Sequence, residues 1–216
     1  MLNRLTRFDT PRPARGGGTL ARIYDAAETG WQDGISKLGF LDAYTDLMAH
    51  SPAPEPAHPK LMDVGTGTGA FAQAWINAHG HPRALTLTDI SPAMLKAAKS
   101  RMPEARTINA PLGATLPDVP AQDVVLCAHV IEHLSDPRAA LRWLHDQLAP
   151  GGLLIMAISK PHWCTALVRW RWGNAAFAPS QTRTMLEQAG FTDITTHPFR
   201  AGPPSRVSCG YIARRP

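Results

Sequence analysis

The segment 61–69, Leu-Met-Asp-Val-Gly-Thr-Gly-Thr-Gly, decides the fold. A short apolar, strand-like run leads directly into a glycine-rich turn, and residues 70–79 then follow a helical pattern. Such a turn between a strand and a helix lets the backbone approach a ligand where side chains would collide. The segment therefore predicts that a nucleotide-like ligand is held at the start of a βαβ unit.

The second requirement of such a unit is an acidic residue at the end of the next strand, where it accepts hydrogen bonds from ribose hydroxyls. Residues 85–89, Leu-Thr-Leu-Thr-Asp, supply Asp89, which lies 89 − 69 = 20 residues beyond Gly69. This agrees with the offset of about 20 residues that is typical of nucleoside-binding units. Asp89 is therefore the predicted ribose ligand.

Asp63 helps to distinguish between two classes of cofactor. Its carboxylate would repel the pyrophosphate of a dinucleotide, but it suits a ligand that carries a sulfonium and an ammonium group. The loop also reads G-x-G-x-G rather than the dinucleotide pattern G-x-G-x-x-G. Charge and spacing therefore favour a methyl donor over NAD and disfavour an NAD-dependent oxidoreductase.

Strand-like and helix-like segments alternate after residue 60, which predicts a parallel sheet with helices on both faces. The expected strands are 60–64, 84–88, 106–109, 123–127 and 152–158, and the expected helices are 70–79, 92–102, 137–148 and 181–189. Strands at 191–198 and 206–214, joined across a turn at 202–204, would complete the sheet as an antiparallel pair. The predicted fold class is α/β, with a seven-stranded Rossmann-like sheet, mostly parallel and with an antiparallel last strand.

Composition excludes several classes of protein. With 44% hydrophobic and 18% charged residues among 216, the chain can bury a core and is not globally disordered. No apolar run approaches the ~20 residues of a membrane-spanning helix. The three cysteines, Cys127, Cys164 and Cys209, form neither a disulfide framework nor a zinc knuckle, which favours a cytoplasmic location. The net charge of +5 is spread along the chain without a nucleic-acid-binding module, so no nucleic-acid partner is expected.

Four motifs appear in order: LMDVGTGTGAFA (61–72), LTDISPAMLKAAK (87–99), QDVVLCAHVIEHLSDP (122–137) and LAPGGLLIMAISKP (148–161). On these motifs, together with EQAGF (187–191), the chain resembles the class I S-adenosylmethionine-dependent methyltransferases. Within that family it looks like the small-molecule group that includes the ubiquinone and menaquinone methyltransferases. The resemblance implies S-adenosyl-L-methionine as cofactor and S-adenosyl-L-homocysteine as product.

The resemblance also implies a division of the chain. Residues 1–18 would be a flexible basic tail without the apolar core of a secretory signal. Residues 19–50 would form an N-terminal helical cap, separated by a proline-rich connector from the cofactor-binding methyltransferase domain at 60–216. A lid is expected at 161–179, after the fifth strand.

The cofactor contacts implied by the resemblance lie on the glycine loop and on the next three strand ends. Ile90 and Met94 would flank the adenine. The aspartate that the family places near the adenine is replaced here by Leu112, followed by Gly113, so the adenine amine needs another acceptor, such as a backbone carbonyl or Asn109. The full set is Asp63, Gly65, Thr66, Gly67, Gly69, Asp89, Ile90, Met94, Leu112, Gly113 and Ala128.

His129 follows the fourth strand, at the edge of the sheet where ligands bind in open α/β folds. It is a candidate base or acceptor contact, and the alternative is that it packs or bonds to backbone. Residues 129–133 also match the H-x-x-E-H string of zinc peptidases. That site needs a helix through all five residues, whereas this segment starts where a strand ends, so no metal is expected. Glu132 and His133 would instead brace the loop, with His133 also a candidate acceptor contact.

Aromatic residues of the cap and the lid are further candidates for the acceptor side. Tyr24 and Trp31 in the cap either contact the acceptor or pack onto the sheet. Trp163 and Arg169 belong to a tryptophan- and arginine-rich lid. Such a surface suits an aromatic or acidic acceptor, or peripheral contact with lipid; the alternative is inward packing of the tryptophans.

The expected activity is transfer of a methyl group to a small acceptor, lipophilic or acidic, by direct in-line displacement. Alignment of the reactants supplies much of such catalysis, and a general base is needed only where the acceptor must lose a proton. A non-catalytic partner subunit that binds the same cofactor is the alternative, because the glycine loop and Asp89 would serve both. The acceptor atom and the oligomeric state stay open at this level.

Overall fold

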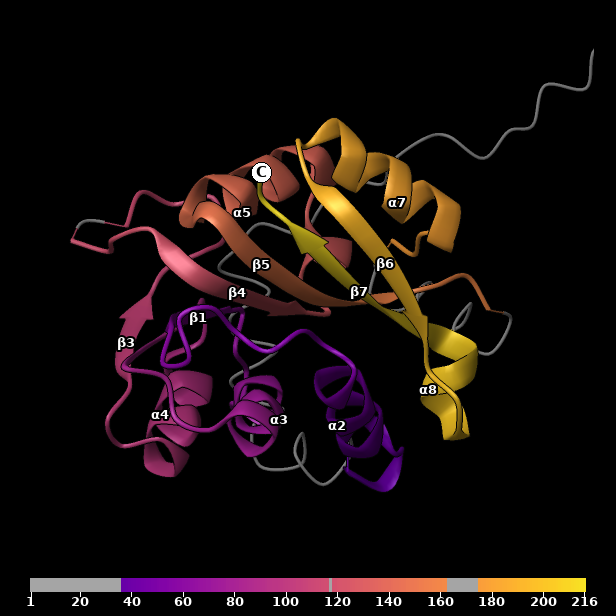
Figure 1. The fold of residues 1–216 in the computed structure, drawn as a ribbon. Coiled ribbons are helices and arrows are strands. Elements are labelled where there is room, and N and C mark those ends of the chain that lie inside the picture. Colours follow the sequence, from indigo (N-terminus) through magenta and orange to yellow (C-terminus); the bar gives the residue numbers. More distant parts are fainter. Residues whose placement is uncertain (1–35, 117, 163–174) are drawn as a thin grey trace, which may run out of the picture.

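A seven-stranded sheet organises the computed structural model, which describes residues 36–116, 118–162 and 175–216 (Figure 1). The strand order is β3-β2-β1-β4-β5-β7-β6. The described strands run parallel to one another except β7, which is antiparallel to β5 and β6 on either side of it. The predicted fold class is therefore confirmed. The strands are β1 (Lys60–Val64), β2 (Ala84–Asp89), β3 (Arg106–Asn109), β4 (Gln122–Ala128), β5 (Leu148–Ser159), β6 (Thr192–Pro198) and β7 (Ser208–Arg214).

Helices cover both faces of this sheet, as Figure 1 shows. One face carries α2 (Phe40–Ala49), α3 (Ala70–His79) and α4 (Pro92–Arg101), and the other carries α5 (Pro137–Gln147) and α7 (Pro179–Gln188). Successive side chains of a strand point to opposite faces. Leu61 accordingly lies in the core under α2 and α3, and Met62 in the core under α5 and α7.

The start of α4 follows the local sequence signals. Ser91 Oγ accepts a hydrogen bond from the backbone N–H of Met94 at 3.1 Å, and Pro92 occupies the first turn. A proline costs little there, because the first N–H groups of a helix have no partner within the helix. Ser91 is thus the N-cap of α4.

The C-terminal region differs from the prediction. Residues 202–204 do not form a simple turn but begin a short helix, α8 (Gly202–Val207), and β7 starts at Ser208 rather than at residue 206. Pro203 and Pro204 lie in the first turn of this helix, where their missing N–H groups cost nothing. The expected turn residues therefore also suited a helix start.

The N-terminal cap is described only from residue 36 onward. Gly39, with φ of 81°, precedes α2, and Leu38 is 48% exposed, so the predicted helical cap at 19–50 is interrupted just before Phe40. The predictions for the tail, Tyr24, Trp31 and residues 163–174 of the lid lie outside the described residues. Within the described part, no helix has the length and apolar character needed to cross a bilayer.

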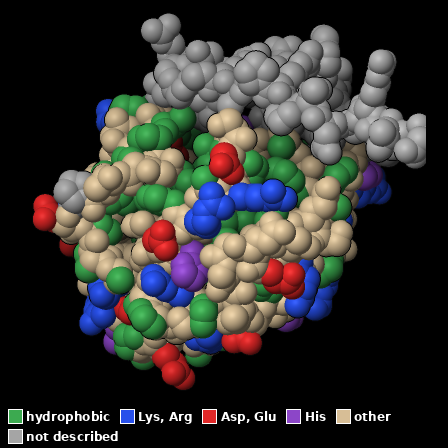
Figure 2. Space-filling view, turned by 90° about the horizontal axis from the view of Figure 1, so that it is seen from above, with side chains coloured by type: hydrophobic (Ala, Val, Ile, Leu, Met, Phe, Trp, Pro, Cys, Tyr) green, Lys and Arg blue, Asp and Glu red, His purple; other side chains and the backbone are tan. Residues whose placement is uncertain are grey.

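The predicted spread of charge is visible on the face that carries α5 and α7. Figure 2 shows lysine and arginine side chains interspersed with acidic ones there, rather than gathered in one basic patch.

Candidate active site

The glycine loop packs tightly between the carboxyl ends of the central strands. Gly65, Gly67 and Gly69 all have positive φ angles, of 66°, 53° and 85°. A Cβ added to Gly65 would lie 2.3 Å from Cγ2 of Val130, and one added to Gly69 would lie 2.4 Å from Cε of Met102. The backbone conformation therefore favours glycine at both positions. At Gly65 the Val130 side chain also leaves no room for a Cβ, whereas at Gly69 the end of the flexible Met102 side chain could move aside.

Asp89 ends β2 directly beside this loop. Its Oδ2 accepts a hydrogen bond from the N–H of Gly67 at 2.8 Å, and its Oδ1 accepts one from the N–H of Ser91 at 2.9 Å. The side chain amide of Asn109 donates to the backbone carbonyl of Asp89 at 2.9 Å. The predicted ribose ligand and the glycine loop thus form one hydrogen-bonded unit.

Asp63 lies behind the loop and is fully buried, with 1% of its surface exposed. Its Oδ2 accepts from the Thr66 hydroxyl at 2.7 Å, whereas Oδ1 has no hydrogen-bond partner among the described residues. Burial raises the pKa of Asp63 to about 7, although the Thr66 hydrogen bond works in the opposite direction. An unpartnered buried carboxylate oxygen of this kind is stabilised by a cationic donor.

His129 lies just beyond β4 and has a left-handed backbone, with φ of 56°. Its backbone N–H donates to the Ala157 carbonyl at 2.8 Å, which fixes the residue against β5. Its Nδ1 lies 3.2 Å from Oε1 of Glu132 and 3.2 Å from the Ser159 hydroxyl, and its Nε2 lies 3.4 Å from the Ser208 hydroxyl. Non-glycine residues rarely take this backbone conformation, and where they do it frequently marks a functional site.

Glu132 supplies a buried negative charge behind this imidazole. Oε1 also accepts from the N–H of Ser159 at 2.5 Å, and Oε2 is buried without a described partner. Burial by itself would raise the pKa of Glu132, but the hydrogen bond and charge of His129 and the N–H of Ser159 outweigh it, so the pKa lies below its ordinary value. The arrangement can hold an imidazole in a fixed orientation and stabilise its protonated form.

Aromatic side chains of α2 cover this end of the sheet. The Phe40 ring meets His129 edge to face at a centroid distance of 5.4 Å, and Tyr44 lies 6.4 Å from His129 and 4.8 Å from Phe71. Burial, with the charges of Glu132 and Asp63, raises the pKa of the Tyr44 phenol, which therefore stays neutral. The helix thus places two aromatic residues over the histidine.

Comparisons with known proteins agree with this geometry. A family model described as a methyltransferase domain matches residues 62–154. The trans-aconitate 2-methyltransferase of Variovorax paradoxus is 32% identical over 117 residues, covering 54% of this chain and 43% of that protein. A ubiquinone/menaquinone biosynthesis C-methyltransferase of a Shewanella species is 28% identical over 109 residues, covering 47% and 43%. The chain thus spans less than half the length of these curated relatives.

The fold comparison extends over almost the whole chain. The N-methyltransferase NodS of Bradyrhizobium japonicum, solved with S-adenosyl-L-homocysteine, superposes with a TM-score of 0.72 at 18% identity, covering 94% of this chain and 100% of that one. Residues 62–154 match a methyltransferase domain, and the comparisons together support a class I S-adenosylmethionine-dependent methyltransferase. The cofactor of this family is S-adenosyl-L-methionine, as the motifs predicted.

The remaining predicted cofactor residues of this methyltransferase domain lie outside the glycine loop and differ in burial and packing. Met94 is 1% exposed and packs within the core at the start of α4, whereas Ile90 is half-buried beside Asp89. Leu112 and Gly113 lie in the segment after β3, where Leu112 packs against the core under α5. Ala128 ends β4 and packs against the opposite core. Their contacts with the cofactor stay predictions.

The zinc-peptidase string at 129–133 does not have the helix that such a site needs. Only Ile131–His133 forms a helix, a single 3₁₀ turn, and His129 precedes it in a left-handed conformation. His133 donates its backbone N–H to the Val130 carbonyl at 3.0 Å and is half-buried. The segment instead orients Glu132 toward His129, as a brace of the loop.

Residues 175–177, in the region predicted as a lid, are hydrogen-bonded to the same loop and to the end of β5. The N–H of Ala175 donates to the Glu132 carbonyl at 2.8 Å, and the N–H of Phe177 donates to the Ser159 carbonyl at 3.0 Å. Trp163 and Arg169, like Tyr24 and Trp31, lie outside the described residues, so their acceptor contacts stay predictions.

Sequence reasoning missed the aromatic residues closest to the histidine. The spacing of Phe40 and Tyr44 does carry a signal, because residues four apart on a helix share one face. Two hydrogen-bond partners of His129 are Ser159, at the end of β5, and Ser208, at the start of β7. The sequence pattern does not show that these strand ends lie next to His129.

Proposed function

We propose that this chain transfers a methyl group from S-adenosyl-L-methionine to a small acceptor, lipophilic or acidic, by direct in-line displacement. The main observation that supports this proposal is that three features lie together at one edge of the sheet. There the glycine loop hydrogen-bonded to Asp89, the unpartnered oxygen of Asp63 and the Glu132-braced His129 come together.

The cofactor end of the proposed site rests on the two aspartates. Asp89, which ends β2 beside the glycine loop, would accept hydrogen bonds from the ribose hydroxyls. Oδ1 of Asp63 would receive a cationic group of the cofactor, directly or through water, which would satisfy the one acceptor of this carboxylate that has no described partner. The residues therefore fit this cofactor, and bound S-adenosyl-L-methionine would supply a methyl group activated by its sulfonium.

The acceptor end would be lined by Phe40, Tyr44 and His129. An acceptor hydroxyl, amine or acidic C–H would give its proton to Nε2 of His129, the nitrogen that does not face Glu132. The Glu132 carboxylate would then stabilise the imidazolium that forms. The neutral Tyr44 phenol and the Phe40 ring would exclude water and orient the acceptor.

The acceptor class is proposed from the relatives and from charge. The matched relatives are named for trans-aconitate and for ubiquinone/menaquinone biosynthesis, and others for malonyl-[acyl-carrier protein]. The net charge of +5 favours the approach of acidic molecules. These observations support a small acidic or lipophilic acceptor, free or attached to a carrier.

Calorimetry with S-adenosyl-L-methionine, S-adenosyl-L-homocysteine and NAD tests the cofactor. We expect binding of the first two, and binding of NAD alone would overturn the assignment. A metabolite extract incubated with labelled methyl donor then tests transfer, with Glu132→Gln as the matched variant. Cofactor binding without label transfer to any acceptor, in wild type and variant alike, would favour the non-catalytic partner subunit instead.

A further inference from the structure

A second cluster of titratable side chains lies away from the His129 site, where the end of α2 meets the edge strand β6. Asp46 and His50 are four residues apart, and His197 comes from a strand 151 residues away in sequence from Asp46. Nε2 of His197 lies 2.8 Å from Oδ2 of Asp46, and Nδ1 of His50 lies 3.5 Å from Oδ1 of Asp46. One ligand atom from each residue falls within 4.8 Å of the others.

We propose that Asp46, His50 and His197 bind a divalent transition metal ion of the Zn²⁺ type. Two imidazoles and one carboxylate are the donor set that such borderline ions prefer over Mg²⁺ or Ca²⁺. A pair four residues apart on a helix and a third ligand from another element is a common way to surround three sides of an ion. Water would complete the coordination, because His50 and Asp46 are partly exposed.

The distances within the cluster suit a metal. A metal would take the place of the proton between His197 and Asp46. Tetrahedral ligands at metal distances of about 2.0–2.1 Å lie about 3.3 Å apart. The 2.8 Å pair would therefore open by about half an ångström, a small adjustment for side chains at the surface.

The neighbouring Arg200 side chain opposes metal binding. Its Nη2 lies 3.4 Å from Nε2 of His50, while Nδ1 of His50 lies 2.7 Å from the Asp46 backbone carbonyl. Donation from Nδ1 to that carbonyl leaves the Nε2 lone pair directed at the guanidinium. The ion would displace this exposed cation, so Arg200 weakens the site without forming part of it.

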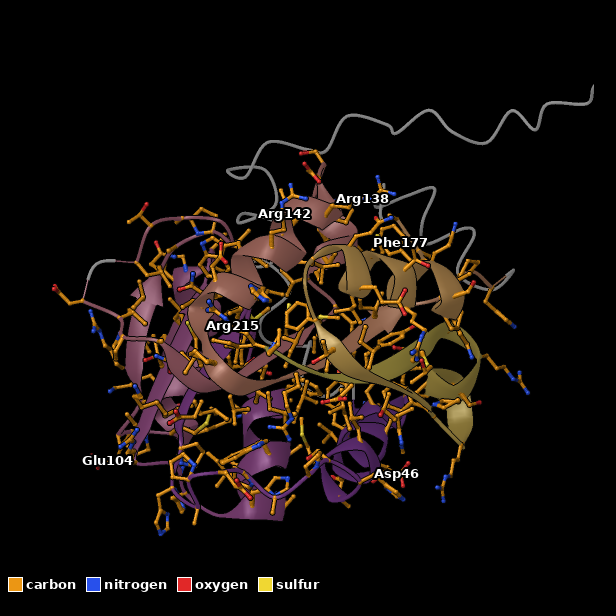
Figure 3. The ribbon with its side chains drawn as sticks, turned by 45° about the horizontal axis from the view of Figure 1, so that its top comes forward. Asp46, Glu104, Arg138, Arg142, Phe177 and Arg215 are labelled. Atoms are coloured by element: carbon orange, nitrogen blue, oxygen red, sulfur yellow. The ribbon has the colours of Figure 1, made fainter. Side chains whose placement is uncertain are left out.

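Occupancy would have a structural consequence for the acceptor side. Asp46 lies on α2, on the side of the sheet opposite to Arg138 and Arg142 of α5 (Figure 3). The same helix holds Phe40 and Tyr44 over His129. A metal bridge from α2 to β6 would fasten this helix to the edge of the sheet. The inference stands on the cluster itself and does not depend on the proposed methyl transfer.

The experiment uses the tag-free full chain titrated with Co²⁺, followed by its visible d–d absorption, and with Zn²⁺, followed by calorimetry. We expect one equivalent of Zn²⁺ to bind and to raise the melting temperature by on the order of 5 °C at a hundredfold excess over Kd. A chelator should reverse the shift. No sulfur-to-cobalt charge-transfer band should appear, because the proposed ligands are nitrogen and oxygen.

Matched variants locate the ion. His197→Gln and Asp46→Asn should weaken binding by at least about 100-fold, since even residues behind metal ligands are worth about 10- to 100-fold. His81→Ala, which removes an exposed histidine elsewhere, should leave it unchanged. Arg200→Ala should tighten binding several-fold, an effect that a misfolded variant would not produce. Binding that survives His197→Gln and does not respond to Arg200→Ala, or no binding at all to the wild type, would overturn the proposal.

Discussion

The backbone N–H of Gly67 donates a hydrogen bond to Oδ2 of Asp89 at 2.8 Å, so the acidic end of β2 and the glycine loop after β1 are one structural unit. The carboxylate holds the loop through Gly67 and the start of α4 through Ser91. Asp89 therefore has a structural role in addition to its proposed contact with the ribose. Any test of cofactor binding at this residue must separate the two.

Asp89→Ala should weaken S-adenosyl-L-homocysteine binding by about 10- to 100-fold, because hydrogen bonds to a charged group contribute about 1.5–3 kcal/mol. Calorimetry measures the affinity. Asp123→Ala is the matched control, since Asp123 also accepts a backbone N–H, from Lys60 at 2.7 Å, but at the opposite end of β1. The control should lose stability and keep its affinity for the cofactor product. Equal affinity in Asp89→Ala and wild type would contradict the ribose assignment.

Asp63 should make cofactor binding depend on pH near neutrality. Its folded-state pKa of about 7 lies above the ordinary value, so protonated Asp63 favours folding. This contribution to stability is fully present below about pH 4 and is lost as the pH rises through 7. A ligand that places a cationic group at this carboxylate, such as the α-ammonium group of S-adenosyl-L-homocysteine, has the opposite preference, because that group interacts with the ionised form.

The affinity for S-adenosyl-L-homocysteine should accordingly increase as the pH rises from 5.5 to 7.5, by as much as about tenfold per unit below the pKa. Binding near pH 6 should also release a proton, visible as a dependence of the calorimetric enthalpy on the buffer. Asp63→Asn should remove both effects. A pH-dependent affinity that persists in this variant would show that another group is responsible.

The sequence predicted the parts of the site that are local. The turn at Gly65–Gly69 and the acid that ends β2 depend on residues close together along the chain, and the structure contains both. These features follow from backbone conformation and strand ends, which short segments specify strongly.

The parts that could not be predicted depend on contacts between distant segments. Ser208 reaches His129 from β7 across 79 residues, and α2 is placed over the same histidine by packing. The short helix at 202–207 shows a further limit, since two prolines suit a turn and a helix start equally well. Spacing along the chain carries no information on such pairings.

Gly65 should be intolerant of substitution for two separable reasons. In Gly65→Ala, the left-handed backbone costs about 1–2 kcal/mol, and overlap with Val130 adds to this. Gly39→Ala is the matched control, because Gly39 has a similar φ of 81° but nothing within 4 Å of its added Cβ. Chemical denaturation should give a larger loss of unfolding free energy for Gly65→Ala, part of which Val130→Ala restores. Equal losses in the two single variants would refute the steric contribution.

Glu132 should affect turnover far more than binding. Glu132→Gln keeps an oxygen that accepts the Ser159 N–H but removes the charge beside Nδ1 of His129. We expect kcat for an acceptor found in the labelled-methyl screen to fall about 10- to 100-fold, because the imidazolium loses its counter-charge. KM for the acceptor and the affinity for S-adenosyl-L-homocysteine should stay within about twofold.

Two further variants keep this prediction separate from a loss of structure. Glu132→Ala also leaves the Ser159 N–H without its acceptor. It should therefore lower the unfolding free energy by about 1–3 kcal/mol as well as lowering activity. Glu187→Gln removes an exposed carboxylate paired with Arg183 and should change neither quantity measurably. If Glu132→Gln lowered the cofactor affinity as much as kcat, Glu132 would support the fold of the site rather than the proton transfer. The role of His129 as a base would then lose its main support, because an imidazole without a buried counter-charge has no special means to hold the proton it accepts.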